Sequence, residues 1–393
     1  MTSSEGHVLP PLSQEELRHS RALGALIAAE VSAAGGWLSF ERYMELALYA
    51  PGLGYYSAGS VKLGAQGDFV TAPEVSELFG RCVARQCAAV LANTGGQILE
   101  LGAGTGRLAA TLLTALDAGG ALPERYAILE VSADLAERQR AHLAQLPPHL
   151  RERVRWLTHL PPAGFRGVML ANEVADALPC RRFTLQEGAL RELGVVLDPA
   201  GTLREAAGPP APELQAEWER LAPELPAPLA DGYTSEICLR AGPWIASLAD
   251  ALAAGALLVF DYGLPRRHYY HAQRLTGTLR CHFRHRVHDD PYLNVGLQDI
   301  TAWVDFTRLA QAADEAGLTL AGFATQAAFL LATGLETLVA EAAGARERAR
   351  LAGEARRLVM PEEMGEAFKV LALTRQYEAP LAGFALQDLR HLL

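Results

Sequence analysis

Short apolar runs alternate with longer segments of helical spacing along the middle of the chain. Runs that are apolar at nearly every position predict strands buried on both faces, as in a parallel sheet covered by helices. Regular alternation of strands and helices therefore predicts an α/β fold. The predicted strands are 97–101, 126–131, 154–157, 167–171 and 256–260, with a last strand at 367–374 on the edge of the sheet.

Helical spacing dominates the N-terminal part of the chain. Ser13 and Glu16 form a capping-box pattern, which predicts a helix that runs to about residue 34. Ser39 is placed to cap a second helix, which must end before Pro51. A third helical pattern follows a loop at 67–73. These patterns predict an N-terminal arm made of helices rather than strands.

The pattern also predicts how the chain divides. We expect an N-terminal helical extension at 1–95 and a main domain at 96–393. The main domain carries two long insertions, at about 180–250 and 264–300, which interrupt the alternation of strands and helices. Loops of that length inside a domain are usually functional, so we expect the insertions to lie on the substrate side.

A glycine-rich turn follows the first predicted strand. Residues 98–107 read ILELGAGTGR, and the apolar run ends at Glu100. Glycine tolerates positive φ and lets a ligand approach the backbone. In doubly wound folds, nucleotides bind at such turns, beside the carboxyl ends of the strands. The three glycines stand at alternate positions, Gly102, Gly104 and Gly106.

The spacing of this turn favours S-adenosylmethionine over a dinucleotide. A dinucleotide fingerprint requires G-x-G-x-x-G, but here the third glycine comes one residue early and Arg107 stands in its place. Glu100 would repel a pyrophosphate, whereas a cationic sulfonium favours a nearby acid. The N-terminus of the following helix can hold the methionine carboxylate. A purely structural turn, or another nucleotide site, is the alternative.

Acidic residues follow two further strands. Glu130 ends the second strand and can accept hydrogen bonds from both ribose hydroxyls, unless it is only an exposed carboxylate. Asn172 and Glu173 follow the fourth strand and should face the cleft. Glu173 and Asp176 could clamp a guanidinium through bidentate hydrogen bonds, or could simply favour a helix N-terminus. Asp261 closes the fifth strand, either at the cleft floor or in a turn.

Three histidines at 282, 285 and 288 raise the question of a metal site. Histidine and aspartate are metal ligands, and Asp289 and Asp290 follow directly. The H-x-x-H-x-x-H spacing does not bring the three side chains together on a strand, and the neighbouring arginines would repel a cation. We therefore predict no metal, and a substrate-facing loop or a structural histidine pair instead.

Composition narrows the class of protein. The 393 residues carry a formal net charge of −10, which argues against a general nucleic-acid binder. The five cysteines show no C-x-x-C pair, as expected in a reducing compartment. The N-terminus has no apolar core of a signal peptide, and no apolar run is long enough to span a membrane. We expect a cytoplasmic protein without a membrane span; its oligomeric state is not predicted.

Several segments together resemble the MidA-like class I methyltransferases, a family that includes the mitochondrial complex I assembly factor methyltransferases. The resemblance covers roughly 40–310. It departs from the family pattern at Val295-Gly296, where the family tends to carry Pro-Gly. The matching segments are YM at 43–44, PGLGYY at 51–56, GDFVTAPEVS at 67–76, FG at 79–80, the turn at 100–106, NE at 172–173 with Asp176 and Pro179, DYG at 261–263, HxxHD at 285–289, DIT at 299–301 and VDF at 304–306.

The resemblance implies a Rossmann-like, seven-stranded methyltransferase sheet with S-adenosylmethionine as methyl donor. It also implies a protein substrate, since the mitochondrial relatives methylate an arginine of a respiratory-complex subunit. Glu173, Asp176 and His288 are then the expected catalytic residues, the first two facing the acceptor. The expected cofactor-binding residues are Gly67, Asp68 and Thr71 on the N-terminal side, together with Glu100, Gly102, Gly104, Gly106, Glu130 and Asn172.

Transfer of a methyl group to an arginine nitrogen of a protein is thus the leading hypothesis. A small-molecule methyltransferase, with the insertions as a lid, is a second hypothesis. A third is an assembly factor that binds the cofactor without turnover. A nicotinamide oxidoreductase is disfavoured by the glycine spacing.

Overall fold

The computed structural model describes residues 9–58 and 70–393 and divides the chain into two units, each built from three chain segments. The first unit comprises Met1–Phe69, Ala177–Arg240 and Tyr270–Ala302. The second comprises Val70–Asp176, Ala241–Tyr269 and Trp303–Leu393. The expected boundary at residue 95 therefore differs from the observed one, and the helix just before it packs in the second unit.

A mostly parallel sheet forms the second unit, and its strand order is β15-β16-β10-β5-β2-β3-β4. The short strand β14 pairs with the end of β10. The predicted α/β fold with a seven-stranded methyltransferase sheet is confirmed, with β14 as an addition. Its strands are β2 (Gln97–Leu101), β3 (Tyr126–Leu129), β4 (Val154–Leu157), β5 (Phe165–Asn172), β10 (Leu252–Leu264), β14 (Val304–Asp305), β15 (Thr319–Thr325) and β16 (Phe368–Arg375).

The predicted edge strand lies inside the sheet. β16 runs antiparallel between β10 and β15, and β15 takes the edge. The sequence of β15, TLAGFAT, is interrupted by Gly322, whose missing Cβ leaves room for the ring of Phe384. A strand with a glycine in its interior gives a weak signal in the sequence, which explains why it was not predicted.

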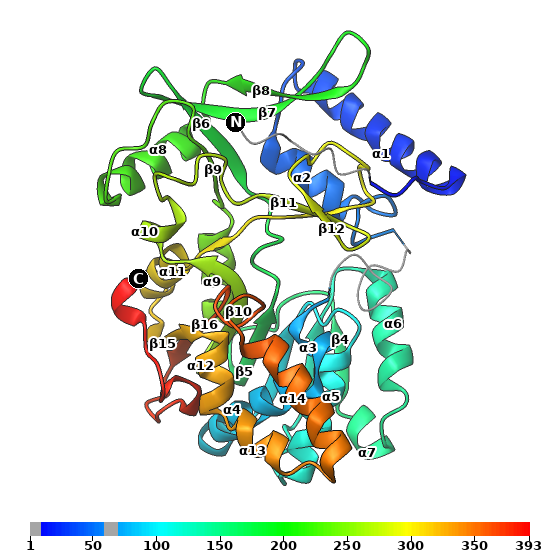
Figure 1. Cartoon of the computed structure of the whole chain (residues 1–393), viewed down its shortest axis with the longest axis vertical. Coiled ribbons are helices and arrows are strands. Elements are labelled where there is room, and N and C mark those ends of the chain that lie inside the picture. The colour runs from blue at the N-terminus through cyan, green and yellow to red at the C-terminus, as the bar shows by residue number, and fades with distance from the viewer. Residues whose placement is uncertain (1–8, 59–69) are drawn as a thin grey trace. The chain divides into compact units, whose positions relative to one another are not determined.

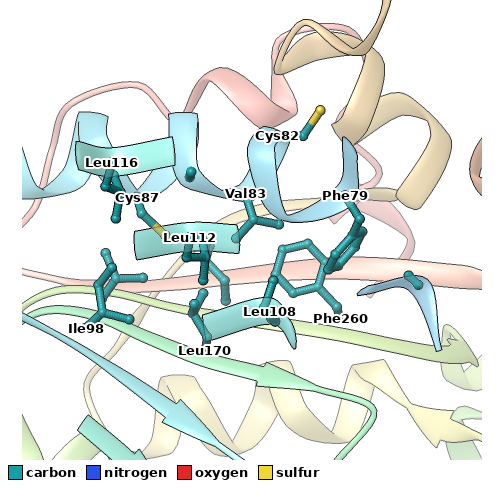
Figure 2. Close-up of a cluster of buried hydrophobic side chains, with 14 of the residues drawn as sticks. Phe79, Cys82, Val83, Cys87, Ile98, Leu108, Leu112, Leu116, Leu170 and Phe260 are labelled. Carbon is teal, nitrogen blue, oxygen red and sulfur yellow. The ribbon is translucent and has the colours of Figure 1, made fainter. Parts of the chain in front are cut away.

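Apolar side chains of α4 (Glu77–Thr94) and α5 (Arg107–Ala118) cover one face of this sheet. Figure 2 shows Val83 and Cys87 of α4 and Leu112 of α5 gathered over Ile98 and Leu170 of the strands. These side chains are fully or almost fully buried. The layer fixes the turn between β2 and α5, because both elements that flank the turn are packed.

The remaining helices of the second unit connect or flank the strands (Figure 1). They are α3 (Ala72–Val75), α6 (Ala133–Leu143), α7 (Pro148–Arg151), α9 (Ala241–Ala251), α10 (Arg266–Tyr269), α11 (Phe306–Glu315), α12 (Gln326–Ala332), α13 (Leu335–Ala340) and α14 (Ala345–Val359), with 3₁₀ turns η2 (Ala382–Phe384) and η3 (Arg390–Leu392).

The first unit joins the N-terminal helices to both insertions. α1 (Gln14–Ala33) begins with the predicted capping box, and Ser39 caps α2 (Phe40–Tyr49) as expected. One sheet has the order β1-β7-β6-β9 with β8 paired to β7, and a second has the order β12-β11-β13. Their bounds are β1 (Leu38–Ser39), β6 (Arg181–Gln186), β7 (Ala189–Leu197), β8 (Leu203–Gly208), β9 (Thr234–Ile237), β11 (Arg280–Phe283), β12 (Arg286–His288) and β13 (Asp299–Thr301), with α8 (Pro212–Leu221) and η1 (Ala222–Glu224) between β8 and β9.

A shared core holds these three segments together. Leu23 of α1 and Tyr43 of α2 belong to the same buried cluster as Val195 of β7, Cys281 of β11 and Ile300 of β13. The hydroxyl of Tyr43 also donates a hydrogen bond of 2.5 Å to the carbonyl of Pro291. The insertions are therefore part of a folded unit, in which they complete the core of the N-terminal helices. Among the described residues, no helix is long and apolar enough to cross a membrane.

Candidate functional site

The glycine turn lies between β2 and α5, as predicted. All three of its glycines have positive φ, with values of 63° at Gly102, 54° at Gly104 and 84° at Gly106. The amide of Gly106 closes the turn by donating to the carbonyl of Ala103 at 2.8 Å. Because L-residues avoid this backbone region, glycine is required here for conformation and not only for space.

Glu130 lies beside this turn, and Gln139 of α6 connects the two. The amide nitrogen Nε2 of Gln139 donates to the carbonyl of Gly104 at 3.0 Å and to Glu130 Oε2 at 2.8 Å. Glu130 Oε1 accepts from the amide of Ser132 at 2.9 Å. Burial raises the pKa of Glu130, against the lowering effect of these bonds. The carboxylate is therefore fixed in direction at the end of β3.

Glu100 is placed differently from the expectation. Its side chain is 2% exposed, and its Oε2 accepts a hydrogen bond of 2.8 Å from the hydroxyl of Tyr126 on β3. Burial, with a smaller contribution from Glu130, raises the pKa of Glu100 to about 7. The carboxyl is thus buried at the end of β2 and bound to the neighbouring strand β3, and its contact with the cofactor stays a prediction.

Acidic residues gather at the turn after β5. Glu173 has a φ of 54°, unusual for a residue with a side chain. Its amide donates to the carbonyl of Phe260 at 2.9 Å, and its Oε1 accepts from Asn172 Nδ2 at 3.2 Å. Such backbone strain clusters at functional sites, where the surrounding structure holds it in place. Glu173 is partly exposed, whereas Asp176 is 5% exposed.

Asp261 accepts hydrogen bonds from the backbone of this turn. Its Oδ2 accepts hydrogen bonds from the amides of Ala175 at 3.0 Å and Asp176 at 3.2 Å, and its Oδ1 accepts from Tyr262. The side chain is completely buried. Burial, and then the charges of Asp176 and Glu173, raise the pKa of Asp261 well above its usual range. Asp261 thus supports the acidic turn through its backbone amides, and its place at the cleft floor stays a prediction.

The turns after β2 and β5 are neighbours. A Cβ added to Gly102 would stand 3.4 Å from a methyl group of Val174, which follows Glu173. β2, β3, β5 and β10 run parallel, so their carboxyl ends share one edge of the sheet. The structure therefore brings together the glycine turn, Glu130 and the acidic turn, as doubly wound folds do at a binding crevice.

Two other predicted residues, Thr71 and His288, belong to other elements. Thr71 precedes α3 at its N-cap position, while Gly67 and Asp68 lie outside the described residues. His288 ends β12 in the first unit, and burial lowers its pKa. His282 is on β11, and burial lowers its pKa to about 4. In the described ranges, no group of three or more His, Cys, Asp or Glu side chains could hold a metal ion.

Two residues that the sequence analysis did not select fit a nucleoside. Val131, directly after Glu130, is 77% exposed, and an exposed apolar side chain beside the acid predicted to bind the ribose suits the flat face of a base. Gln139 couples that acid to the turn. The position of Val131 next to a strand-end acid could have revealed it, but no sequence signal singles out Gln139. The turn, the acid and the apolar side chain together fit an adenosyl cofactor.

Comparison with known proteins identifies the family. Residues 82–324 match the profile of the family described as "Putative S-adenosyl-L-methionine-dependent methyltransferase". The chain is 30% identical over 380 residues to the protein arginine methyltransferase NDUFAF7, mitochondrial, of Danio rerio, covering 88% of this chain and 85% of that protein. It is 29% identical over 374 residues to the Homo sapiens protein of that name, covering 86% and 80%.

Solved structures agree with this assignment. A protein from Burkholderia thailandensis, crystallised with bound S-adenosyl-homocysteine, is 43% identical and has a TM-score of 0.94, covering 98% of this chain and 100% of that chain. A native crystal structure of a protein from that organism has a TM-score of 0.91 at 43% identity, with the same coverage. S-Adenosyl-homocysteine is what S-adenosylmethionine becomes when it gives up its methyl group.

These relatives also correct one expectation. The curated relatives from fish, human and fly are named as mitochondrial proteins, so the predicted cytoplasmic location is contradicted. That prediction used only the absence of a signal peptide and the cysteine pattern, and neither feature separates the compartments of a cell that keep thiols reduced. The family profile, the relatives and the solved structures lead to one conclusion: the chain belongs to the MidA-like class I methyltransferases and uses S-adenosylmethionine as its methyl donor.

Proposed function

We propose that this methyltransferase transfers the methyl group to an arginine nitrogen of a protein. The observation that carries the proposal is the acidic turn after β5, where Glu173 is held in a left-handed conformation above the buried Asp261. Relatives that share 29–30% identity are named protein arginine methyltransferases. The respiratory-complex subunit expected from the family resemblance stays a prediction.

For methyl transfer to a guanidinium, the protein has to orient the acceptor nitrogen and to compensate charge. When bound, the cofactor supplies an electrophilic methyl group on a sulfonium. A guanidinium carries its charge over three nitrogens, so a carboxylate that binds two of them leaves the third free for an in-line approach. Glu173 is the better placed acid, because it is partly exposed and its backbone is fixed by the bond from its amide to Phe260.

The acidic residues also have an electrostatic role. A guanidinium cation must approach a methyl group that is itself part of a cation, and the two repel. Glu173 and Asp176 place negative charge at the acceptor side of the turn, which offsets this repulsion. After transfer, the nitrogen must lose a proton, and the same carboxylates are the groups in this turn that can accept it.

Labelled-methyl transfer tests the proposal. The protein is incubated with [methyl-³H]-S-adenosylmethionine and an extract from cells that lack the enzyme, and the labelled proteins are hydrolysed to amino acids. We expect the label in methylated arginine. Label confined to small molecules, or found in another amino acid, would refute the arginine assignment.

A matched pair of variants tests the role of Glu173. We expect Glu173→Gln to reduce transfer by about 100-fold while S-adenosyl-homocysteine binds with unchanged affinity, since an amide cannot carry the compensating charge. Glu187→Gln is the control, because Glu187 is also a glutamate with positive φ, at 53°, but lies in the exposed turn between β6 and β7. Loss of cofactor binding in the first variant would assign Glu173 to the cofactor instead.

A further inference from the structure

A glutamate outside the predicted site holds the glycine turn. Thr105 stands between two of the glycines, and its Oγ1 donates a hydrogen bond of 2.5 Å to Glu74 Oε1. The other oxygen of Glu74 lies 3.7 Å from Arg107 Nη1. Thr105 Oγ1 in turn accepts from the amide of Arg107 at 3.4 Å. Glu74 therefore contacts both the turn and the first residue of α5.

Besides backbone hydrogen bonds and the contact of Gln139 with Gly104, the turn depends on its own few side chains. From 102 to 106 it reads GAGTG, so only Ala103 and Thr105 carry side chains, and only Thr105 can form a side-chain hydrogen bond. Glycine loses more backbone entropy on ordering than any other residue. A ligand that binds a loosely held turn must order it, and this cost lowers the affinity. A contact that orders the turn beforehand removes that cost.

Glu74 is itself well anchored. It belongs to α3, which runs from Ala72 to Val75 and is followed by the cap residue Ser76. Ser76 Oγ donates to Glu354 Oε2 of α14 at 2.7 Å, and its side chain also accepts from the amide of Leu78 in α4. The side chain of Glu74 is only 13% exposed. The ordering contact thus starts from an element tied to two longer helices.

We propose that Glu74 is a positioning residue that preorganises the glycine turn for S-adenosylmethionine through Thr105. The role concerns the cofactor and is independent of the methyl acceptor. Because coupling between two elements is reciprocal, the bound cofactor also stabilises the contact of α3 with the turn. This links the segment before α4 to cofactor affinity through the glycine turn.

Calorimetric titration with S-adenosyl-homocysteine tests the proposal on the full chain. We expect Glu74→Ala and Thr105→Val each to raise the Kd about tenfold, because each removes one charge-assisted hydrogen bond that orders the turn. The double variant should bind no more weakly than either single variant, since both remove the same bond. Thr105→Ser keeps the hydroxyl and should bind as the original chain does.

The control is Glu77→Gln, which changes a half-exposed glutamate of α4 whose partner is Arg81. Melting temperatures separate loss of fold from loss of preorganisation, because a positioning role changes the Kd in variants that melt normally. If Glu74→Ala does not fold, Thr105→Val and Thr105→Ser decide the matter. Unchanged affinity in Thr105→Val, or additive losses in the double variant, would overturn the proposal.

Discussion

Removal of the Glu130 carboxylate should weaken binding of the cofactor. Its two oxygens are already directed by the amide of Ser132 and by Gln139 Nε2, at 2.9 and 2.8 Å. A carboxylate held in this way can accept from both ribose hydroxyls without reorganising. Glu130→Ala removes that acceptor and also ends the connection between the carboxylate and the glycine turn through Gln139.

The size of the effect follows from the bonds that are lost. A hydrogen bond to a charged group contributes about 1.5 kcal/mol or more, so two of them contribute about 3 kcal/mol, which is a Kd ratio of about 150. The desolvation that raises the pKa of Glu130 works in the other direction, because part of its burial cost disappears with the side chain. We therefore expect the Kd for S-adenosyl-homocysteine to rise about 100-fold.

The assay is calorimetry with two ligands, S-adenosyl-homocysteine and its analogue lacking both ribose hydroxyls. The original chain should discriminate strongly between them, and Glu130→Ala should bind both equally weakly. Glu137→Ala, a change at an exposed position of the same α6, is the control. A Kd change below about threefold, or a variant that still discriminates between the ligands, would refute the assignment of Glu130 to the ribose.

Three further outcomes are expected. The pKa of Glu100 is about 7 against 4.5 for a free carboxyl, so the folded state keeps a proton that the unfolded chain releases. The free energy of unfolding therefore falls by up to about 3 kcal/mol between pH 4.5 and 7. Glu100→Gln should reduce the drop in melting temperature between pH 5 and pH 8, and an unchanged drop would contradict the shift. Gly106→Ala introduces a Cβ 3.4 Å from Gln139 Cα, at a residue whose φ is 84°. Cofactor affinity and melting temperature should therefore both fall. A variant with normal affinity would show that the turn adapts. Val131→Ser should melt normally, because the side chain is 77% exposed, yet bind S-adenosyl-homocysteine several-fold more weakly if the base packs there, as calorimetry will show.

Much of the sheet could be predicted because strands buried on both faces leave a plain signal. The run at 97–101 is a strand with those bounds, and the glycine turn could be located from its spacing alone. Ser13 and Ser39 cap their helices because capping depends on local hydrogen bonds. These features share one property, which is that the cause lies within a few residues of the effect.

The parts that escaped prediction depend on residues far apart in the sequence. Glu100 was predicted only as an acid near the cofactor, and its hydrogen-bond partner Tyr126 stands 26 residues later in the sequence. The turn that carries Glu173 is bound by the carbonyl of Phe260 and the carboxylate of Asp261, which both belong to β10. Gln139 and Glu74 reach the turn from helices that no local pattern connects with it. In each case the partner is set by the fold.

The three-segment build of the first unit has a consequence for synthesis on the ribosome. Leu23 and Tyr43 share a core with Cys281 and Ile300, so the N-terminal helices cannot complete the burial of their apolar faces until the chain has grown by about 250 residues. At 5–20 residues per second, that delay lasts about 12 to 50 s. Throughout this interval the exposed helices are open to chaperones and to aggregation, and the nascent chain needs protection that the finished protein does not.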